Sequence, residues 1–293
     1  MSVTELSGAR PPATDMRPPI ADRPSFDASA FTRGAAVSEP VRMLPAAAPE
    51  AASANNAELR AHALLAQDVY NDVANPPAGY RVASEADLRA LNLDPSLLGD
   101  GDFRARVYVT GSGAEAEYTI AFRGSQSAGD WVANVQQGAG FDSAHYRSAL
   151  AIGERIARSP LADQVDFTGH SLGGGLASAA AIASGRPADT FNAAGLHGDT
   201  ISDAAALRGG GQAGQVDAWY VGGEILSGIQ DGGDRVIGGL LGGILGGVLA
   251  DAPEAYGIRH GLDSVAPDGK NWLDRHNPAD KHGMDWVLSS LPR

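Results

Sequence analysis

The chain has 293 residues and a formal net charge of -13, which is enough length for one large domain with a buried core. The excess of acidic side chains argues against a nucleic-acid-binding protein and gives no attraction to anionic lipid surfaces, so any membrane contact has to be mainly apolar. The sequence contains no cysteine, which excludes disulfides and metal-thiolate sites.

The first 56 residues differ in composition from the rest of the chain. They are rich in proline and alanine and show no apolar periodicity, which is typical of a disordered leader. They also lack the basic start and uninterrupted apolar run of a secretory signal peptide. We therefore expect a leader over 1–56, a catalytic domain over 57–293 and, if the protein is secreted, export by a route other than the general one.

Helices and strands are predicted to alternate along the rest of the chain. In chain order we expect a helix over Glu58–Tyr70, a short helix over Glu85–Leu91, a hairpin of strands over Arg104–Thr110 and Glu117–Gly124, a helix over Phe141–Arg158, strands beginning at Val165, Thr190 and Val216, and a closing helix around Met284–Leu291. Strands that alternate with helices after a leading hairpin predict an α/β fold, with a mostly parallel central sheet flanked by helices on both faces.

One apolar segment breaks this alternation. Residues 236–250 carry no charge and contain a Gly-Gly pair every four residues. A membrane-spanning helix needs about 20 apolar residues, so this segment is too short to cross a bilayer alone. We interpret it either as a helix packed on the domain through its glycine face, or as an acyl-chain wall or flap that enters a lipid interface.

The segment that most constrains function reads Gly-His-Ser-Leu-Gly and runs from Gly169 to Gly173. It follows a predicted strand and leads directly into a small-residue helix, the context in which G-x-S-x-G marks a nucleophile elbow. A Cβ at either glycine would collide with the sharply turning backbone. We therefore predict that Ser171 is a nucleophile and that the N–H of Leu172, at the start of the helix, stabilises an oxyanion.

A second polar turn follows the predicted strand that ends at Gly124. Acyl transfer needs a further oxyanion donor, which in this kind of fold comes from a loop after an early strand. Ser125 is well placed to supply it through its backbone N–H and its hydroxyl.

The two segments together resemble those of a known family. Phe-Arg-Gly-Ser followed by Asp-Trp, and then Gly-His-Ser-Leu-Gly-Gly, resemble the class 3 lipases of the α/β-hydrolase superfamily. The resemblance covers the element order from about Leu64 to Leu288 but is specific only around 122–134 and 167–176. It implies an α/β-hydrolase fold, an oxyanion role for Ser125 and a lid over 127–135, in which Trp131 could instead be a core aromatic.

A serine nucleophile needs a histidine base, which in this fold follows it in the chain after an acidic partner. Three histidines come late enough, namely His260, His276 and His282. His282 precedes the closing helix, as the catalytic histidine does in class 3 lipases, and His276 is the alternative base. His170 points away from the nucleophile in such an elbow, which predicts a structural role. No chemistry is assigned to the remaining histidines, His62, His145 and His197.

The acidic partner is expected just after the strand that ends near Val221. The family has an aspartate at the position that matches Glu224 here, and a glutamate can serve because only an anionic acceptor is required. Asp231 is the nearest alternative acid, followed by Asp217 and Asp234. The Asp231–Asp234 turn offers too few ligands for calcium, so we interpret it as a solvated turn and predict no metal and no organic cofactor.

These features predict a serine hydrolase of phospholipase A type that cleaves carboxylic esters of membrane glycerophospholipids. The leader, the helix ending in Val-Tyr-Asn-Asp, Glu224 and the Gly-Gly segment resemble antibacterial effectors that some Gram-negative bacteria inject by contact-dependent secretion. That resemblance implies synthesis in the cytoplasm, delivery to the periplasm of a target cell, contact with a membrane surface and a cognate immunity protein. The alternatives are a lipase or esterase for neutral acylglycerols, and an inactive hydrolase scaffold that binds or perturbs membranes.

Overall fold

A computed structural model describes residues 49–125, 143–223, 255–271, 275 and 277–292. Several predicted features lie outside these residues: most of the leader, the lid segment with Trp131, the acid candidates Glu224, Asp231 and Asp234, the Gly-Gly segment over 236–250, and His276. The predictions for them therefore stay predictions. All of the described residues belong to one compact unit.

The described residues form an eight-stranded sheet with the order β1-β3-β4-β5-β6-β7-β8, and β2 pairs with β3. The strands are β1 (Tyr80–Val82), β2 (Gly99–Asp100), β3 (Phe103–Thr110), β4 (Glu117–Phe122), β5 (Val165–His170), β6 (Ala188–Phe191), β7 (Val216–Val221) and β8 (Ile258–Leu262). The pairs that involve β1, β2 and β3 are antiparallel, whereas β4 to β8 run parallel. The predicted hairpin and mostly parallel sheet are therefore confirmed.

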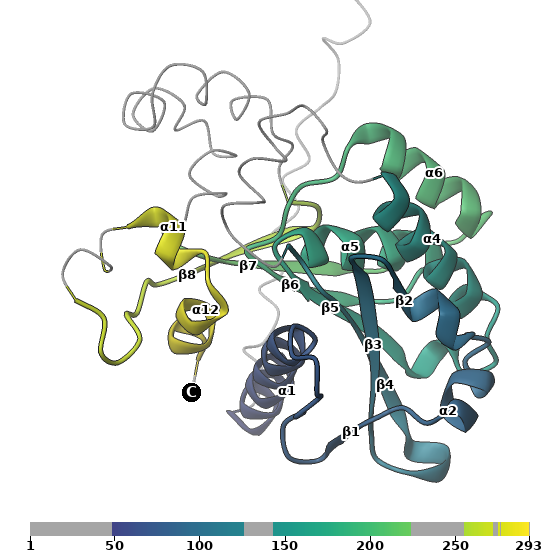
Figure 1. Ribbon diagram of the computed structural model, residues 1–293, viewed down its shortest axis with the longest axis horizontal. Coiled ribbons are helices and arrows are strands. Elements are labelled where there is room, and N and C mark those ends of the chain that lie inside the picture. The colour runs from purple at the N-terminus through teal and green to yellow at the C-terminus, as the bar shows by residue number, and fades with distance from the viewer. Residues whose placement is uncertain (1–48, 126–142, 224–254, 272–274, 276, 293) are drawn as a thin grey trace, which may run out of the picture. The chain divides into compact units, whose positions relative to one another are not determined.

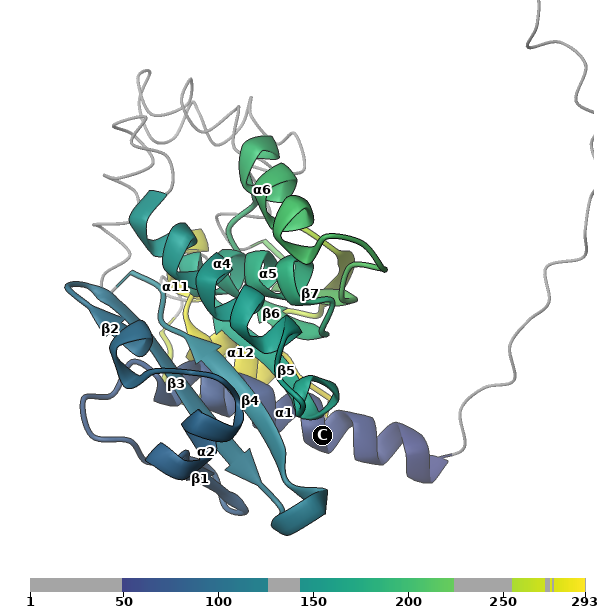
Figure 2. The same cartoon turned by 90° about the vertical axis from the view of Figure 1, so that its right-hand side faces the viewer.

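Helices cover both faces of this sheet. They are α1 (Pro49–Asp68), α2 (Glu85–Ala90), α4 (Ser143–Ala157), α5 (Leu172–Ser184), α6 (Gly198–Arg208), α11 (Pro278–Lys281) and α12 (Met284–Ser290). Helix α5 packs against α4 and α6, while α1 contacts α12, β5 and β6. Figures 1 and 2 show α4, α5 and α6 on one side of the sheet and α1 with α12 on the other.

Apolar clusters fill the space on each face of the sheet. The cluster under α4 and α5 contains Phe122 and Phe167, and the cluster under α1 and α12 contains Phe191 and Trp286. Parallel strands buried on both faces carry near-continuous apolar runs, and β4 has this pattern, with five of its six residues buried. The two clusters hold the carboxyl ends of β4, β5 and β6 side by side, where the functional residues follow.

The structure differs from the prediction at several elements. The short elements β1, β2 and α11 were not predicted, and three longer elements differ as follows. Helix α1 begins at Pro49 rather than Glu58, so its first turns overlap the predicted leader. These turns are rich in alanine, which favours helix even without an apolar face. Helix α6 and strand β8 were not predicted. Strand β8 reads Ile-Arg-His-Gly-Leu and is only partly buried at the end of the sheet order, so it lacks the apolar run of a central strand.

None of the described helices combines the length and the apolar character needed to cross a membrane.

Candidate active site

Ser171 lies on the sharp turn between β5 and α5. Its backbone has φ 59° and ψ -128°, a combination that side-chain-bearing residues rarely adopt and that characterises the nucleophile elbow. The neighbouring glycines make the turn possible, because a Cβ on Gly169 would run into the backbone of Gly173, and a Cβ on Gly173 would run into the carbonyl of Phe122. The elbow is therefore packed directly against the end of β4.

Hydrogen bonds of the backbone hold the elbow in place. The N–H of Ser171 donates to the carbonyl of Phe191 (3.1 Å), and the carbonyl of Ser171 accepts from the N–H groups of Gly174 and Ala194 (3.0 Å each). The hydroxyl of Ser171 makes no capping hydrogen bond to α5, so it is not consumed in fixing the helix start. Only 4% of the residue is exposed.

His282 lies in the turn between α11 and α12 and is buried. Its backbone carbonyl accepts hydrogen bonds from Nε2 of His170 (2.7 Å) and Nδ2 of Asn192 (2.9 Å). The rings of His282 and His170 have centroids 4.9 Å apart. The fold thus brings His282 beside the residue that precedes Ser171, although the two are more than 100 positions apart in sequence.

The two predicted oxyanion donors also come from adjacent segments. Ser125 follows Gly124, and a Cβ on Gly124 would lie 3.3 Å from the backbone nitrogen of Gly173, so the end of β4 touches the first turn of α5. Leu172 is the first residue of α5, where an N–H without an intrahelical partner and the positive end of the helix dipole favour a negative charge. Both donors therefore border the start of α5.

Comparison with known proteins identifies the family. Residues 61–268 match a phospholipase-like family described as a Tle-like phospholipase domain. The chain is also 33% identical over 242 residues to the extracellular phospholipase A1 of Serratia liquefaciens, a match that covers 78% of this chain and 69% of that protein. The chain belongs to the phospholipase-like family. It is accordingly a carboxylic ester hydrolase, and its relative acts outside the cell, in keeping with the predicted secretion.

Two solved esterases resemble the phospholipase-like chain more distantly. A thermostable carboxylesterase cloned from a metagenomic library shares 13% identity with a TM-score of 0.31, covering 82% of this chain and 98% of that one. A hyperthermophilic esterase from the archaeon Pyrobaculum calidifontis shares 12% identity with a TM-score of 0.27, covering 82% and 90%. The family, the mostly parallel sheet and the elbow at Ser171 together show an α/β-hydrolase fold.

The range that matches the family, 61–268, contains Ser125, Ser171 and Glu224 and ends before His282.

The predicted acid Glu224 follows the last described residue of its segment, Gly223. The end of β7 is nevertheless linked to His282, the predicted base, because the N–H of Val221 donates to Oδ1 of Asn192 (3.0 Å) and Nδ2 of Asn192 donates to the carbonyl of His282. The alternative acid Asp217 lies near the amino end of the same strand and binds Nε2 of His260 (2.6 Å). Asp217 and His260 therefore pair with each other near the amino end of β7, away from the end that contacts Asn192.

Asn192 and Tyr70 contact the site, yet the sequence analysis gave neither of them a role in it. Asn192 directly follows β6 and has a positive φ of 42°, and a polar residue at the carboxyl end of a parallel strand is a signal that could have found it. Tyr70 follows α1 and reaches His170 with its hydroxyl. No local pattern distinguishes Tyr70 from an ordinary buried tyrosine.

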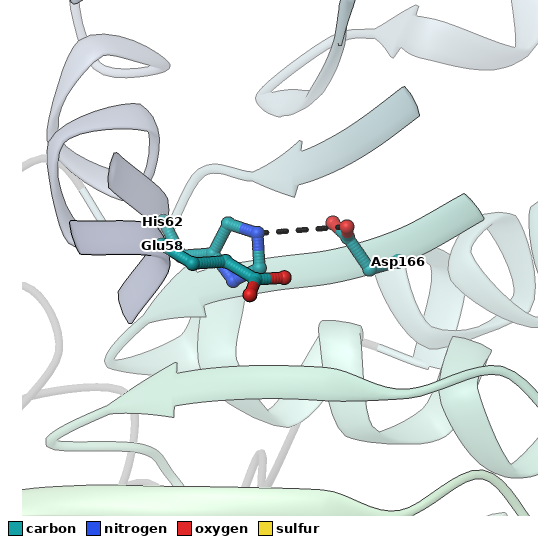
Figure 3. A group of neighbouring side chains, drawn as sticks. All are labelled: Glu58, His62 and Asp166. Atoms are coloured by element: carbon teal, nitrogen blue, oxygen red, sulfur yellow. Dashed lines mark ion pairs between the residues drawn. The ribbon is translucent and has the colours of Figure 1, made fainter. Parts of the chain in front are cut away.

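A group of potential metal ligands lies on the face of the sheet covered by α1. Ligand atoms of Glu58, His62 and Asp166 lie within 4.8 Å of one another, as Figure 3 shows. His62 is already paired, because Nε2 lies 3.5 Å from Asp166 and Nδ1 lies 2.8 Å from Asp189. Burial opposes the charged ring, but these two carboxylates outweigh it and hold the pKa of His62 well above its ordinary value. We therefore interpret the group as a protonated His62 ring paired with carboxylates.

Proposed function

We propose that this phospholipase-like chain hydrolyses acyl esters of membrane glycerophospholipids, in phospholipase A fashion, with Ser171 as nucleophile and His282 as general base. The observation that carries the proposal is the strained elbow at Ser171, with His282 held beside it through His170. Membership of the phospholipase-like family supports the substrate class.

The reaction proceeds in two acyl-transfer steps. His282 removes the proton of Ser171 as Oγ attacks the ester carbonyl, and the N–H of Leu172 together with Ser125 stabilises the oxyanion. The protonated imidazole then donates its proton to the departing lysophospholipid oxygen. Water, activated by the same imidazole, cleaves the acyl-enzyme. Glu224 accepts the second imidazole N–H, with Asp231 as the alternative acid and His276 as the alternative base.

We assign the enzyme the biological role of a secreted antibacterial effector that is delivered to the target-cell periplasm and neutralised by a cognate immunity protein. The resemblance to antibacterial effectors and the extracellular location of the Serratia relative support this role. Directing the enzyme to the periplasm of an unprotected bacterium should stop growth, and co-expression of a neighbouring gene's product should restore it. Normal growth without that product would contradict the role.

The chemical proposal is tested with phospholipid vesicles and Ser171→Ala. Mass spectrometry of the wild-type digest should show fatty acid and lysophospholipid, and Ser171→Ala should release neither above background. The matched control is Ser202→Ala, which removes a hydroxyl that donates to Gly198 on exposed α6 and should leave turnover unchanged. Products from triacylglycerol alone would favour a neutral lipase, and vesicle leakage that persists in Ser171→Ala would favour an inactive membrane-binding scaffold.

A further inference from the structure

A chain of hydrogen bonds joins the segment of the proposed oxyanion hole to the segment of the proposed base. The N–H of Gly124 lies 3.1 Å from the hydroxyl of Tyr70, which lies 3.1 Å from Nδ1 of His170. Nε2 of His170 in turn lies 2.7 Å from the carbonyl of His282. Three segments, the end of β4, the end of β5 and the turn before α12, thus meet through two side chains.

The direction of these hydrogen bonds, from donor to acceptor, follows from the groups at the two ends of the series. The carbonyl of His282 can only accept, so Nε2 of His170 carries a proton, and in the neutral tautomer with that proton Nδ1 is an acceptor. In this tautomer the hydroxyl of Tyr70 donates to Nδ1 and accepts from Gly124. Burial raises the pKa of Tyr70, so the hydroxyl keeps the proton that it donates. Its oxygen also lies 3.4 Å from the carbonyl of His170, a longer contact.

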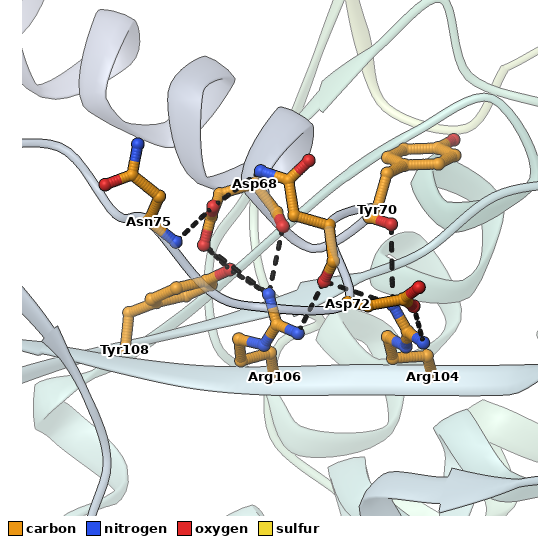
Figure 4. Close-up of polar contacts among 8 residues, drawn as sticks. Asp68, Tyr70, Asp72, Asn75, Arg104, Arg106 and Tyr108 are labelled. Carbon is orange, nitrogen blue, oxygen red and sulfur yellow. Dashed lines mark hydrogen bonds and ion pairs between the residues drawn. The ribbon is translucent and has the colours of Figure 1, made fainter.

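The turn that carries Tyr70 is itself fixed to β3 (Figure 4). Arg106 donates to the carbonyls of Asp68 (2.9 Å) and Asn71 (2.8 Å). Arg104 donates to the carbonyl of Asn71 (3.2 Å) and pairs with Asp72 at 2.8 Å. Two guanidinium groups therefore cap the carbonyl end of α1, where positive charge is favoured, and this limits the positions that the Tyr70 ring can take.

The carbonyl of His282 is held from a second side as well. Nδ2 of Asn192 donates to it at 2.9 Å, while Oδ1 of the same amide accepts from Val221. His170 and Asn192 thus approach one oxygen from β5 and β6, respectively. Two donors on one carbonyl fix the direction of the His282 backbone more strictly than either would alone.

We propose that Tyr70 and His170 are positioning residues: the Tyr70 hydroxyl sets the Gly124–Ser125 segment and, through His170, the backbone of His282, so that one relay aligns oxyanion donor and base on Ser171. This inference rests on the proposed roles of Ser125, Ser171 and His282. A displacement of about 1 Å at a reacting group can cost about 100-fold in rate, so breaking the relay should lower kcat while leaving substrate binding nearly unchanged.

The test compares Tyr70→Phe, His170→Ala, His170→Gln and the double variant Tyr70→Phe/His170→Ala on phospholipid vesicles. We expect kcat to fall roughly 10- to 100-fold in Tyr70→Phe and His170→Ala, with KM within about twofold of the wild type. The double variant should lose no more than the worse single variant, because both changes break one chain. His170→Gln should recover part of the loss, since its amide N–H can take the place of Nε2.

The control is Tyr118→Phe, which removes the hydroxyl of a buried tyrosine at the amino-terminal part of β4 and should leave kcat unchanged. Unchanged kcat in Tyr70→Phe, or additive losses in the double variant, would overturn the relay. If His170→Ala does not fold, Tyr70→Phe decides, because it removes a single oxygen. Activity retained in Ser171→Ala would instead overturn the proposed function, so the two failures are distinguishable.

Discussion

The two ends of the parallel strands hold their neighbouring segments in different ways. At the amino ends, His62 on α1 lies between Asp166 on β5 and Asp189 on β6, so charged groups join the helix to the sheet. Asp189 also accepts a hydrogen bond from the indole of Trp219 on β7 (3.0 Å). Attraction between charges falls off slowly with distance and tolerates small displacements, which suits a contact that holds two layers together.

At the carboxyl ends, directional hydrogen bonds to the backbone hold the segments around the elbow. Tyr70, His170 and Asn192 all act on backbone atoms of Gly124 or His282. A hydrogen bond weakens steeply when its angle is lost, so it fixes orientation as well as distance. We infer that the contacts at the amino ends stabilise the fold and that those at the carboxyl ends align the proposed catalytic residues. Each of the following changes tests that division.

The largest effect is expected from His282→Ala at the carboxyl ends. Loss of the base should reduce kcat by about 10⁶-fold, the loss that removal of the catalytic histidine causes in a serine protease, with little change in the unfolding midpoint. Vesicle hydrolysis and thermal unfolding of the same preparations measure both quantities. The paired variant His276→Ala should keep most of its activity, and the reverse order of losses would transfer the role of base to His276.

A methyl group at Gly124 should disturb alignment and stability together. A Cβ there would run into the hydroxyl of Tyr70 and approach the carbonyl of His170 at 2.6 Å. We expect Gly124→Ala to lower kcat by about 100-fold and the free energy of unfolding by about 1–3 kcal/mol. Gly198→Ala is the matched control, because a Cβ at that position meets nothing within 4 Å. Equal behaviour of the two variants would contradict the close packing.

At the amino ends, His62→Ala should lower stability and spare the chemistry. It leaves Asp166 and Asp189 facing each other without a cation, which should cost about 2–4 kcal/mol in the free energy of unfolding once the partial exposure of both carboxylates is allowed for. Urea unfolding measures this, with exposed His197→Ala as the control. The folded fraction should keep wild-type kcat, and a selective fall in kcat would show that the two ends are not separate.

The same ion pair predicts a pH dependence of stability. The pKa of His62 is raised in the folded protein by Asp166 and Asp189, against the effect of burial, whereas the unfolded value is ~6.5. Its contribution is therefore complete below ~6.5 and is lost as pH rises through the folded-state pKa. The pKa of nearby Glu58 is also raised, because the effect of burial exceeds the opposing attraction of His62. Urea midpoints of the wild type should fall from pH 6 to 9 more than those of His62→Ala.

The smallest effect is expected from His260→Ala. His260 binds Asp217 at 2.6 Å and stacks on Trp219, but about a third of the histidine side chain is exposed. The loss in the free energy of unfolding should be about 1 kcal/mol, and kcat should not change. Chemical denaturation and vesicle turnover test both expectations, and a large fall in kcat would restore His260 as a candidate base.

The sequence by itself determined the elbow, the fold class and the family. The demand for glycine at position 169 comes from the backbone of Gly173 in the same turn, whereas that at position 173 comes from the carbonyl of Phe122 on β4. The spacing of the two glycines around one serine nevertheless displays the elbow in the sequence. The parallel sheet followed from the order of helices and strands, because a parallel connection needs a crossover helix. These features are marked by residue spacing or by element order, both of which a sequence displays directly.

Only the tertiary structure decided which side chains serve the site and which hold the layers together. Tyr70 lies 100 positions before His170, and His62 lies 127 positions before Asp189; no local pattern marks either pair. The sequence analysis assigned no chemistry to His62, because nothing in the sequence distinguishes it from a histidine on the surface. Its partners come from two different strands, and the pairing exists only because α1 packs across the face where β5 and β6 lie side by side.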